Sequence, residues 1–487
     1  MLFDREPFNR LPLIAPGGRL SVHLLRATIV LGVLGASVVL GAVAGPVADE
    51  IDPLVLVVAG AAPVGLLALN WLVRNWPWMP VLILVTAAFT PIALPTGRGS
   101  RMVDSLLVTG VCAGLWVLRM ITVEKRLSLR PTPLNPPLLV FMAMTLWSIV
   151  WSNLYRDPAV WIWGSFTFVQ ILSGLTNILL CAAFLMVYNF VEDLRMLKVL
   201  TGVMLAAAAV GLVVRYDLLP AAIGSLIINV GGLFTMWCIA LGAALALYCS
   251  RWHWGWRVLA GAMAVLYVIW GLILHISWLA GWLPGLVVLA VLIWQHSRKA
   301  VALMLVGVLI FAAFNYAEFE QAFAAENEES GQTRLAAWAQ NWQITKDHLL
   351  FGTGPAGYAV YYMSYFPTDA MATHSNYIDM LSQNGLAGFL PMLAFFAGMA
   401  WIGYRLTRRL RGRGDFVEGL ANAGFAGTLG CIVAMAFGDW LFPFAYTQTI
   451  EGFDYAVYSF LFMGATLVLD RLTQPGMPLA APEAAHA

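Results

Sequence analysis

Long apolar runs constrain the fold of this chain more than any other feature. Stretches of about 18 or more mostly apolar residues recur along its 487 residues, and each is long enough to cross the hydrocarbon core of a bilayer as a helix. Hydrophobic residues make up 61% of the chain and charged residues only 11%, whereas soluble domains carry roughly 25% charged residues. We therefore predict an all-α, polytopic integral membrane protein.

The apolar runs predict about fourteen transmembrane helices and one large loop that contains short helices. The predicted spans lie near residues 24–45, 53–73, 77–95, 102–120, 136–153, 170–190, 195–213, 229–249, 257–273, 277–295, 299–316, 385–404, 416–437 and 454–470. They divide the chain into an N-terminal membrane bundle at 1–316, a loop at 317–385, C-terminal membrane helices at 386–471 and a tail at 472–487, which we expect to be disordered.

The basic residues orient these spans. If the N-terminus is cytoplasmic, most of the 27 Lys and Arg residues fall in cytoplasmic segments, including the cluster at 405–413. This bias follows the positive-inside rule and places both termini inside and the large loop outside. Topology does not explain the basic residues that remain outside, so they are candidates for contacts with an anionic ligand, although a surface cation is often only solvated. They are Arg98, Arg101, Arg156, Arg215, Arg334 and Lys346.

The large loop begins its ordered part with a predicted helix. Ser330 or Thr333 can cap its start, and Gly352 is expected at its C-terminal cap. Apolar residues recur along it at helical spacing, namely Leu335, Trp338, Trp342 and Leu349. The two tryptophans suit either a helix lying at the membrane interface or a packed core.

Three glycines follow this helix and fit the pattern G-x-G-x-x-G: Gly352, Gly354 and Gly357. A dinucleotide site is excluded, because that motif needs a preceding strand within a βαβ unit and none is predicted here. We interpret the glycines as a tight structural turn that sets the helix against the rest of the loop.

His374 opens a second short helix, which Gly385 closes just before the next span. The helix N-terminus favours the neutral imidazole and also offers free N–H groups to an anion. His374 is therefore a candidate general base or phosphate contact, although a lone histidine is more often structural. The loop has no His, Asp and Glu cluster at ligand spacing, and the five cysteines show no C-x-x-C spacing. We expect a metal-independent site without a cofactor.

Ionisable residues are nearly absent from the middles of the predicted spans. Pumps and ion-coupled transporters need such groups at mid-membrane. The pattern favours chemistry at the outer interface. A transporter for a small anion or a lipid-linked sugar, and a catalytically silent scaffold, remain the alternatives.

The loop carries three sequence patterns in order. They are T-R-L-x-x-W at 333–338, D-H-L-L-F-G-T-G at 347–354 and H-S-N-Y-x-x-x-L-x-x-x-G-L-x-G at 374–388. Together with the many preceding spans, they resemble the O-antigen ligase and O-antigen polymerase superfamily of bacterial envelope glycosyltransferases. The resemblance implies transfer of a glycan from an undecaprenyl-diphosphate carrier to another glycan, a lipid A core or a similar acceptor, at the outer face of the cytoplasmic membrane, by a metal-independent inverting reaction.

The resemblance also implies roles for individual residues. Arg334 matches the loop arginine assigned to the diphosphate, and His374 matches the histidine that activates the acceptor hydroxyl. Further substrate contacts are expected at Arg215, Asn229, His275, Lys346 and Asn376. Relatives often carry Ser-Arg at the outer start of the span before the leading helix pair of the loop, and this chain has His275-Ile276-Ser277-Trp278 instead.

Overall fold

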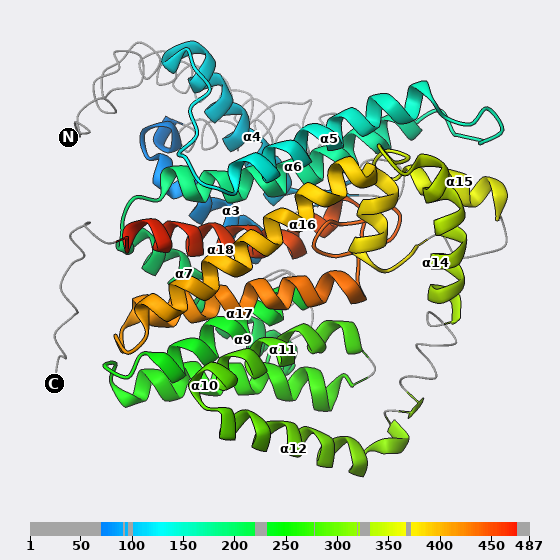
Figure 1. Ribbon diagram of the computed structural model, residues 1–487. Coiled ribbons are helices and arrows are strands. Elements are labelled where there is room, and N and C mark those ends of the chain that lie inside the picture. The colour runs from blue at the N-terminus through cyan, green and yellow to red at the C-terminus, as the bar shows by residue number, and fades with distance from the viewer. Residues whose placement is uncertain are drawn as a thin grey trace, which may run out of the picture. The chain divides into compact units, whose positions relative to one another are not determined.

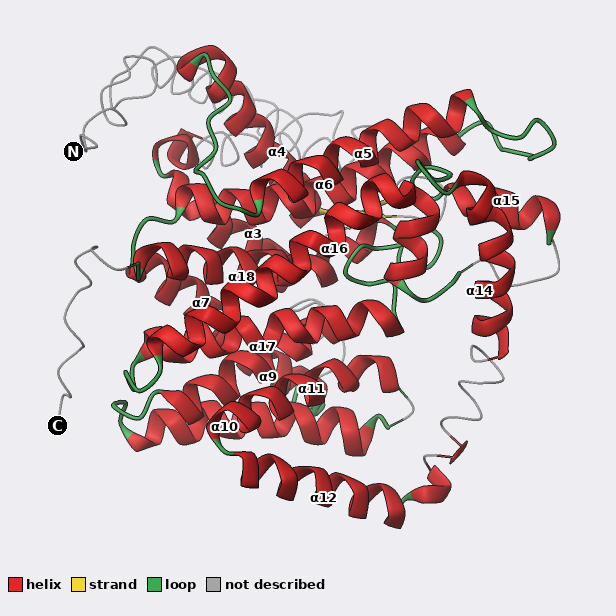
Figure 2. Ribbon diagram, viewed as in Figure 1, coloured by secondary structure: helices red, strands yellow, loops and turns green. Residues whose placement is uncertain are grey.

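The computed structural model describes residues 70–90, 93–95, 101–219, 231–276, 278–318, 320–321, 332–366 and 372–474. Helices make up nearly all of this part of the chain (Figure 2). Eight of them are long and apolar enough to cross a membrane. The prediction of an all-α membrane protein is therefore confirmed.

The helices follow the chain in a simple order. They are η1 (Trp76–Trp78), α3 (Met79–Phe89), α4 (Asp104–Arg119), η2 (Met120–Glu124), α5 (Asn135–Leu154), α6 (Phe166–Phe190), α7 (Leu194–Arg215), α9 (Gly232–Tyr248), α10 (Trp254–Ile269), η3 (Trp270–Leu274), α11 (Leu279–His296), α12 (Arg298–Phe314), α14 (Gln332–Thr345), η5 (Lys346–His348), α15 (Gly357–Tyr365), α16 (Asn376–Leu410), α17 (Phe416–Phe437), η6 (Ile450–Gly452) and α18 (Phe453–Leu472).

Each predicted span from residue 102 onward coincides with one of these helices, with a break at His275 between η3 and α11. The span predicted near 77–95 is too long. Helix α3 ends at Phe89, and β1 (Ala93–Pro95) pairs antiparallel with β2 (Arg101–Val103). The helix ends there because Pro91 lacks a backbone N–H and disfavours a helical residue before it. The span near 24–45 and nearly all of the one near 53–73 lie outside the described residues.

The chain forms two compact units. The first consists of residues 1–79 and 114–129, and the second of residues 80–113 and 130–487. In the described part of the first unit, the Arg119 guanidinium lies 4.8 Å from the centre of the Trp76 ring and forms a 3.0 Å ion pair with Glu124. The second unit contains every candidate site residue that the structure describes.

Helices α6, α17 and α18 form the centre of the second unit. The most apolar window of α18 is 94% buried, against 28% for α5. Helix α18 packs on α6 and α17, and α17 also packs on α9, α11 and α16 (Figure 1). Trp237 Nε1 donates to Ser459 Oγ at 3.0 Å. Side chains that cannot reach water thus find partners on neighbouring helices, and the peripheral helices keep apolar surface for lipid.

Helix α16 is broken at Gly385, where φ is 59° and ψ is −172°. The break frees two amide groups, and the loop accepts both: Leu386 N donates to Leu349 O at 2.8 Å and Ala387 N to Leu350 O at 3.0 Å. A Cβ at position 385 would lie 2.4 Å from the carbonyl of Leu350. The short helix predicted to end at Gly385 and the span that follows are therefore two arms of one kinked element, and the loop is attached at the kink.

We expect Gly385→Ala to lower the free energy of unfolding by about 2 kcal/mol or more, because a left-handed residue costs about 1–2 kcal/mol even before the contact with Leu350. Thermal unfolding of the full chain in lipid nanodiscs measures this. Gly307→Ala is the control, since a Cβ there meets nothing within 4 Å and alanine favours the helix. Equal melting temperatures for the two variants would contradict the assignment.

Candidate functional site

Helix α14 faces the segment that carries His374. Trp338 Nε1 donates to Thr373 O at 2.7 Å, and Thr345 Oγ1 lies 2.9 Å from Ser382 Oγ on α16. Residues four apart share a helix face, so Arg334 lies on the same side of α14 as Trp338. The structure thus brings Arg334 and His374, two residues forty positions apart, to facing segments of one site.

The large apolar residues of α14 divide between two sides of the helix. Leu335 is 67% exposed and Trp342 53% exposed, whereas the enclosed side is formed by Ala337, Asn341 and Ile344. These two sides lie about 140° apart around the helix, at 100° per residue. The sequence left both tryptophans open between an interfacial and a packed position. The structure packs Trp338 against Thr373 and leaves Trp342 exposed.

The glycines at 352–357 form the turn that follows this helix. Thr353 N donates to Ser382 O and Gly354 N to Gln383 O, both at 2.9 Å, and Gly357 begins α15. Gly352 has φ of 72°, and a Cβ there would lie 2.3 Å from Gln383 O. Gly352 closes the helical stretch that continues α14. Helix α14 itself ends at Thr345 and continues into η5, and the left-handed Gly352 donates its N–H to His348 O at 2.8 Å, as a C-terminal glycine cap does.

His374 is partly buried directly before α16, and its φ of 50° lies in the left-handed region. This conformation costs about 1–2 kcal/mol for a residue with a Cβ. The flanking residues hold it in place, since Thr373 O accepts from Trp338 and Asn376 N donates to Gly438 O at 3.1 Å. Strain of this kind collects at functional sites when the surrounding structure enforces it.

Asp379 is a buried acidic residue that sequence reasoning missed. Its Oδ1 accepts from the Tyr358 hydroxyl at 2.7 Å and from Thr373 Oγ1 at 2.5 Å, and its Oδ2 is buried without a hydrogen bond to any described residue. Burial, together with the carboxyl of Asp379, raises the pKa of Tyr358 well above its ordinary value, so the phenol remains a donor. Asp379 is the sole acidic residue between positions 372 and 414, and this isolation is the feature of the sequence that could have singled it out.

Asn376 uses its side chain within the protein. The side chain is fully buried, Nδ2 donates to Phe442 O at 2.7 Å, and Oδ1 accepts from Leu441 N at 3.0 Å and Phe442 N at 3.2 Å. The structure therefore places Asn376 as the residue that holds the 438–442 segment beside the start of α16.

Arg215 and His275 form a second group around Trp270. The Arg215 guanidinium lies 3.7 Å from the centre of the Trp270 ring, and the rings of Trp270 and His275 are 4.1 Å apart. Trp270 Nε1 also donates to Arg215 O at 3.1 Å. No pattern in the sequence indicated that Trp270 would lie between these two candidate residues. Lys346 is exposed on η5, and Asn229 lies outside the described residues.

A cavity of about 310 Å³ lies beside the second group and is lined by neither arginine and neither histidine of the two groups. Trp278 and Trp440 line it, with ring centres 6.0 Å apart. Trp278 also lies 6.4 Å from Trp270, while Trp440 belongs to the 438–442 segment held by Asn376. Gly231 and Gly232, at the N-terminus of α9, complete one wall. A helix N-terminus carries partial positive charge and offers free N–H groups, so this cavity suits an anion.

His348 lies in the loop beside Tyr361, with ring centres 4.8 Å apart. Burial lowers its pKa below the ordinary value, and the nearby carboxylates of Asp347 and Asp157 oppose that shift only in part. Across the described ranges, no group of three or more His, Cys, Asp or Glu side chains is arranged to hold a metal ion.

Residues 221–393 match the model of a family described as O-Antigen ligase. This part of the chain is similar to O-antigen ligase. The match includes Arg334, the glycine turn and His374, and it confirms the resemblance drawn from the loop patterns. No curated protein matches the chain.

We expect Asn376→Ala to destabilise the protein by about 1–3 kcal/mol, because it leaves buried backbone groups at 441 and 442 without partners. The melting temperature in nanodiscs measures this. Asn315→Ala is the matched control, since that amide donates only to Phe311 O in its own helix. A stable Asn376→Ala protein with weakened substrate binding would instead assign Asn376 to substrate contact.

The loop should also lose stability in acid through His348. A lowered pKa means that the unfolded chain takes up the proton first, so stability is complete above about pH 6.5 and declines below it. We expect the melting temperature to fall less between about pH 7 and pH 5 in His348→Asn than in the wild type. Identical slopes for the wild type and His348→Asn would rule out this role.

Proposed function

We propose that the protein is a glycosyltransferase of the O-antigen ligase or polymerase type. In this proposal it transfers a glycan from an undecaprenyl-diphosphate carrier to an acceptor hydroxyl at the outer face of a bacterial cytoplasmic membrane. The observation that carries the proposal is the pairing of facing segments within the region that matches O-antigen ligase: the Arg334 face of α14 is fixed by Trp338 to the strained segment that carries His374.

The diphosphate of the donor is assigned to the cationic groups of the site. Arg334 reaches it from α14, and Arg215 from its place on the face of the Trp270 ring. The N-terminus of α9, which lines the 310 Å³ cavity, adds partial positive charge. Cleavage of the sugar–phosphate bond leaves negative charge on the diphosphate. Guanidinium groups bind phosphate oxygens in pairs, and a partly dry site strengthens their effect. Asn229, His275 and Lys346 are proposed as further contacts, and the apolar outer helices as the path of the lipid tail.

The acceptor is assigned to His374. Its neutral imidazole takes the proton of the acceptor hydroxyl while the oxygen attacks the anomeric carbon from the face opposite the diphosphate. One bond forms to the acceptor oxygen, the bond to the phosphate oxygen breaks, and the configuration inverts. The step needs no metal ion. Asn376 and Asp379 position the segment, since both bind within the protein.

The distribution of arginine and lysine supports the finer topology of the proposal. About fourteen spans place both termini in the cytoplasm and the loop that contains α14 and α15 outside. In that arrangement the reaction takes place at the headgroup layer, where the carrier lipid presents its diphosphate.

In vitro transfer tests the proposal. We expect purified protein in nanodiscs, given undecaprenyl-diphosphate oligosaccharide without added metal, to form product that is resolved on a gel. His374→Ala should reduce the rate by about 100-fold or more, which is the usual contribution of a general base, and Arg334→Ala should also reduce it strongly. Arg405→Ala, an exposed arginine near the far end of α16, is the control. Full transfer by both site variants would refute the roles assigned here.

The same assay separates the subclasses. A ladder of longer carrier-linked glycans indicates a polymerase, whereas product that forms only after a distinct acceptor such as lipid A core is added indicates a ligase. An unchanged donor under both conditions, with folded protein, would favour the transporter or scaffold alternative.

A further inference from the structure

A cavity of about 670 Å³ lies at the end of the second unit farthest from the site. It forms where α9 and α11 end and where α16 turns into α17 (Figure 1). Helix α16 begins at Asn376, two residues after His374, and ends at Leu410, next to the lining residue Arg411. Its 35 residues trace a path of about 50 Å at 1.5 Å per residue. The cavity is therefore separate from the proposed transfer site.

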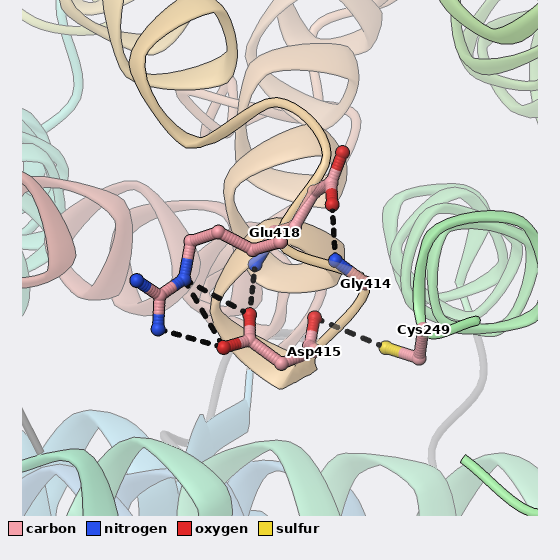
Figure 3. A network of polar contacts seen from close by, with 5 residues as sticks. Cys249, Gly414, Asp415 and Glu418 are labelled. Carbon is pink, nitrogen blue, oxygen red and sulfur yellow. Dashed lines mark hydrogen bonds and ion pairs between the residues drawn. The ribbon is translucent and has the colours of Figure 1, made fainter. Parts of the chain in front are cut away.

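The turn between α16 and α17 forms one wall, and its own acidic residues hold it rigid (Figure 3). Glu418 accepts from Gly412 N at 2.9 Å and from Gly414 N at 2.6 Å. Asp415 binds the Arg413 guanidinium at 2.7 Å and caps α17. Cys249 Sγ donates to Asp415 O at 3.4 Å, which fastens the turn to the end of α9. The Glu418 carboxylate is thus occupied by backbone N–H groups, and the Asp415 carboxylate by Arg413 and the start of α17.

Three arginines line the cavity and form no ion pair with a described carboxylate: Arg298, Arg408 and Arg411. Their neighbours Arg409 and Arg413 pair with Asp470 and Asp415. Across the described ranges, no ion pair includes any of the three lining arginines. The sole carboxylate in the lining is Glu418, so the cavity carries excess positive charge.

The remaining lining suits a phosphate group at a membrane surface. Gln295 Nε2 is a buried donor with no acceptor among the described residues, and Gln295 lines the cavity. Trp294 and Tyr404 lie at its edge and are half exposed, as aromatic side chains at headgroup depth commonly are. The ends of membrane-spanning helices lie in this layer, where anionic lipids are concentrated and basic pockets between helices bind their headgroups.

We infer that this cavity binds a phosphate-bearing anion, namely the headgroup of an anionic phospholipid from the adjoining leaflet. Arg408 and Arg411 on α16 and Arg298 on α12 bind the phosphate oxygens, and Gln295 adds a donor. Soluble phosphate has the same chemistry, and the test separates the two sources. The inference does not depend on the proposed glycosyl transfer.

The full-length protein in nanodiscs tests this inference. Lipid retained by the protein is measured by native mass spectrometry, and the dissociation constant is measured by titrating phosphatidylglycerol against a phosphatidylcholine background. A parallel arm titrates inorganic phosphate. We expect the double variant Arg408→Gln with Arg411→Gln to bind phosphatidylglycerol roughly tenfold more weakly or worse, because each basic residue near the membrane surface strengthens the binding of anionic lipid. The control variant, Arg405→Gln with Lys299→Gln, also removes two positive charges at this end of the unit. Neither residue lines the cavity, so this variant should bind phosphatidylglycerol like the wild type.

The outcomes are distinct. Phosphatidylglycerol binding that depends on the lining arginines supports a lipid site, and phosphate binding with the same dependence assigns the cavity to a soluble anion. Equal binding by the wild type and the lining variant, or an equal loss in the control pair, overturns the inference. Arg408→Lys with Arg411→Lys keeps the charge and should retain most binding, which separates anion recognition from misfolding. His374→Ala should bind the lipid normally even if it abolishes transfer.

Discussion

Every backbone N–H and C=O within a bilayer needs a partner from the protein, and the break in α16 at Gly385 shows how this chain meets that demand. The helix gives up its own hydrogen bonds there, and the loop carbonyls of Leu349 and Leu350 replace them. The same exchange continues at Ser382 and Gln383, which accept from the glycine turn. The loop is therefore joined to a spanning helix through backbone bonds, which require glycine at 352 and 385 because a Cβ at either position would collide with the partner backbone.

Polar side chains then set the geometry of the site on this frame. Asp379 ties α15 and Thr373 to α16, Trp338 ties α14 to the same segment, and Asn376 holds the 438–442 segment on the other side. Because these groups are buried, each unmade bond would be costly. The arrangement supplies the constraint that keeps His374 in a left-handed conformation. Several polar side chains near the histidine therefore make their hydrogen bonds within the protein.

Arginine has different physical roles at the two ends of the second unit. Near the site, Arg215 lies on the face of Trp270 and Arg334 lies on the enclosed side of a short helix. At the far end, some arginines pair with carboxylates and close the α16–α17 turn, while Arg298, Arg408 and Arg411 line a cavity. The positive-inside rule explains why arginines gather at that end. It does not explain why only some of them are paired, and the proposed lipid headgroup accounts for that difference.

The sequence by itself determined the helical membrane architecture, most helix bounds from residue 102 onward and the resemblance to O-antigen ligase, because length, apolarity and loop patterns are local properties of the chain. It also singled out His374, Arg334 and the glycine turn. Only the tertiary structure decided which residues meet. The inward face of α14 is made of small and polar side chains, and Asp379 and Trp270 gain their roles from partners far away in sequence. Such contacts depend on how helices pack against one another, which periodicity within a single helix does not encode.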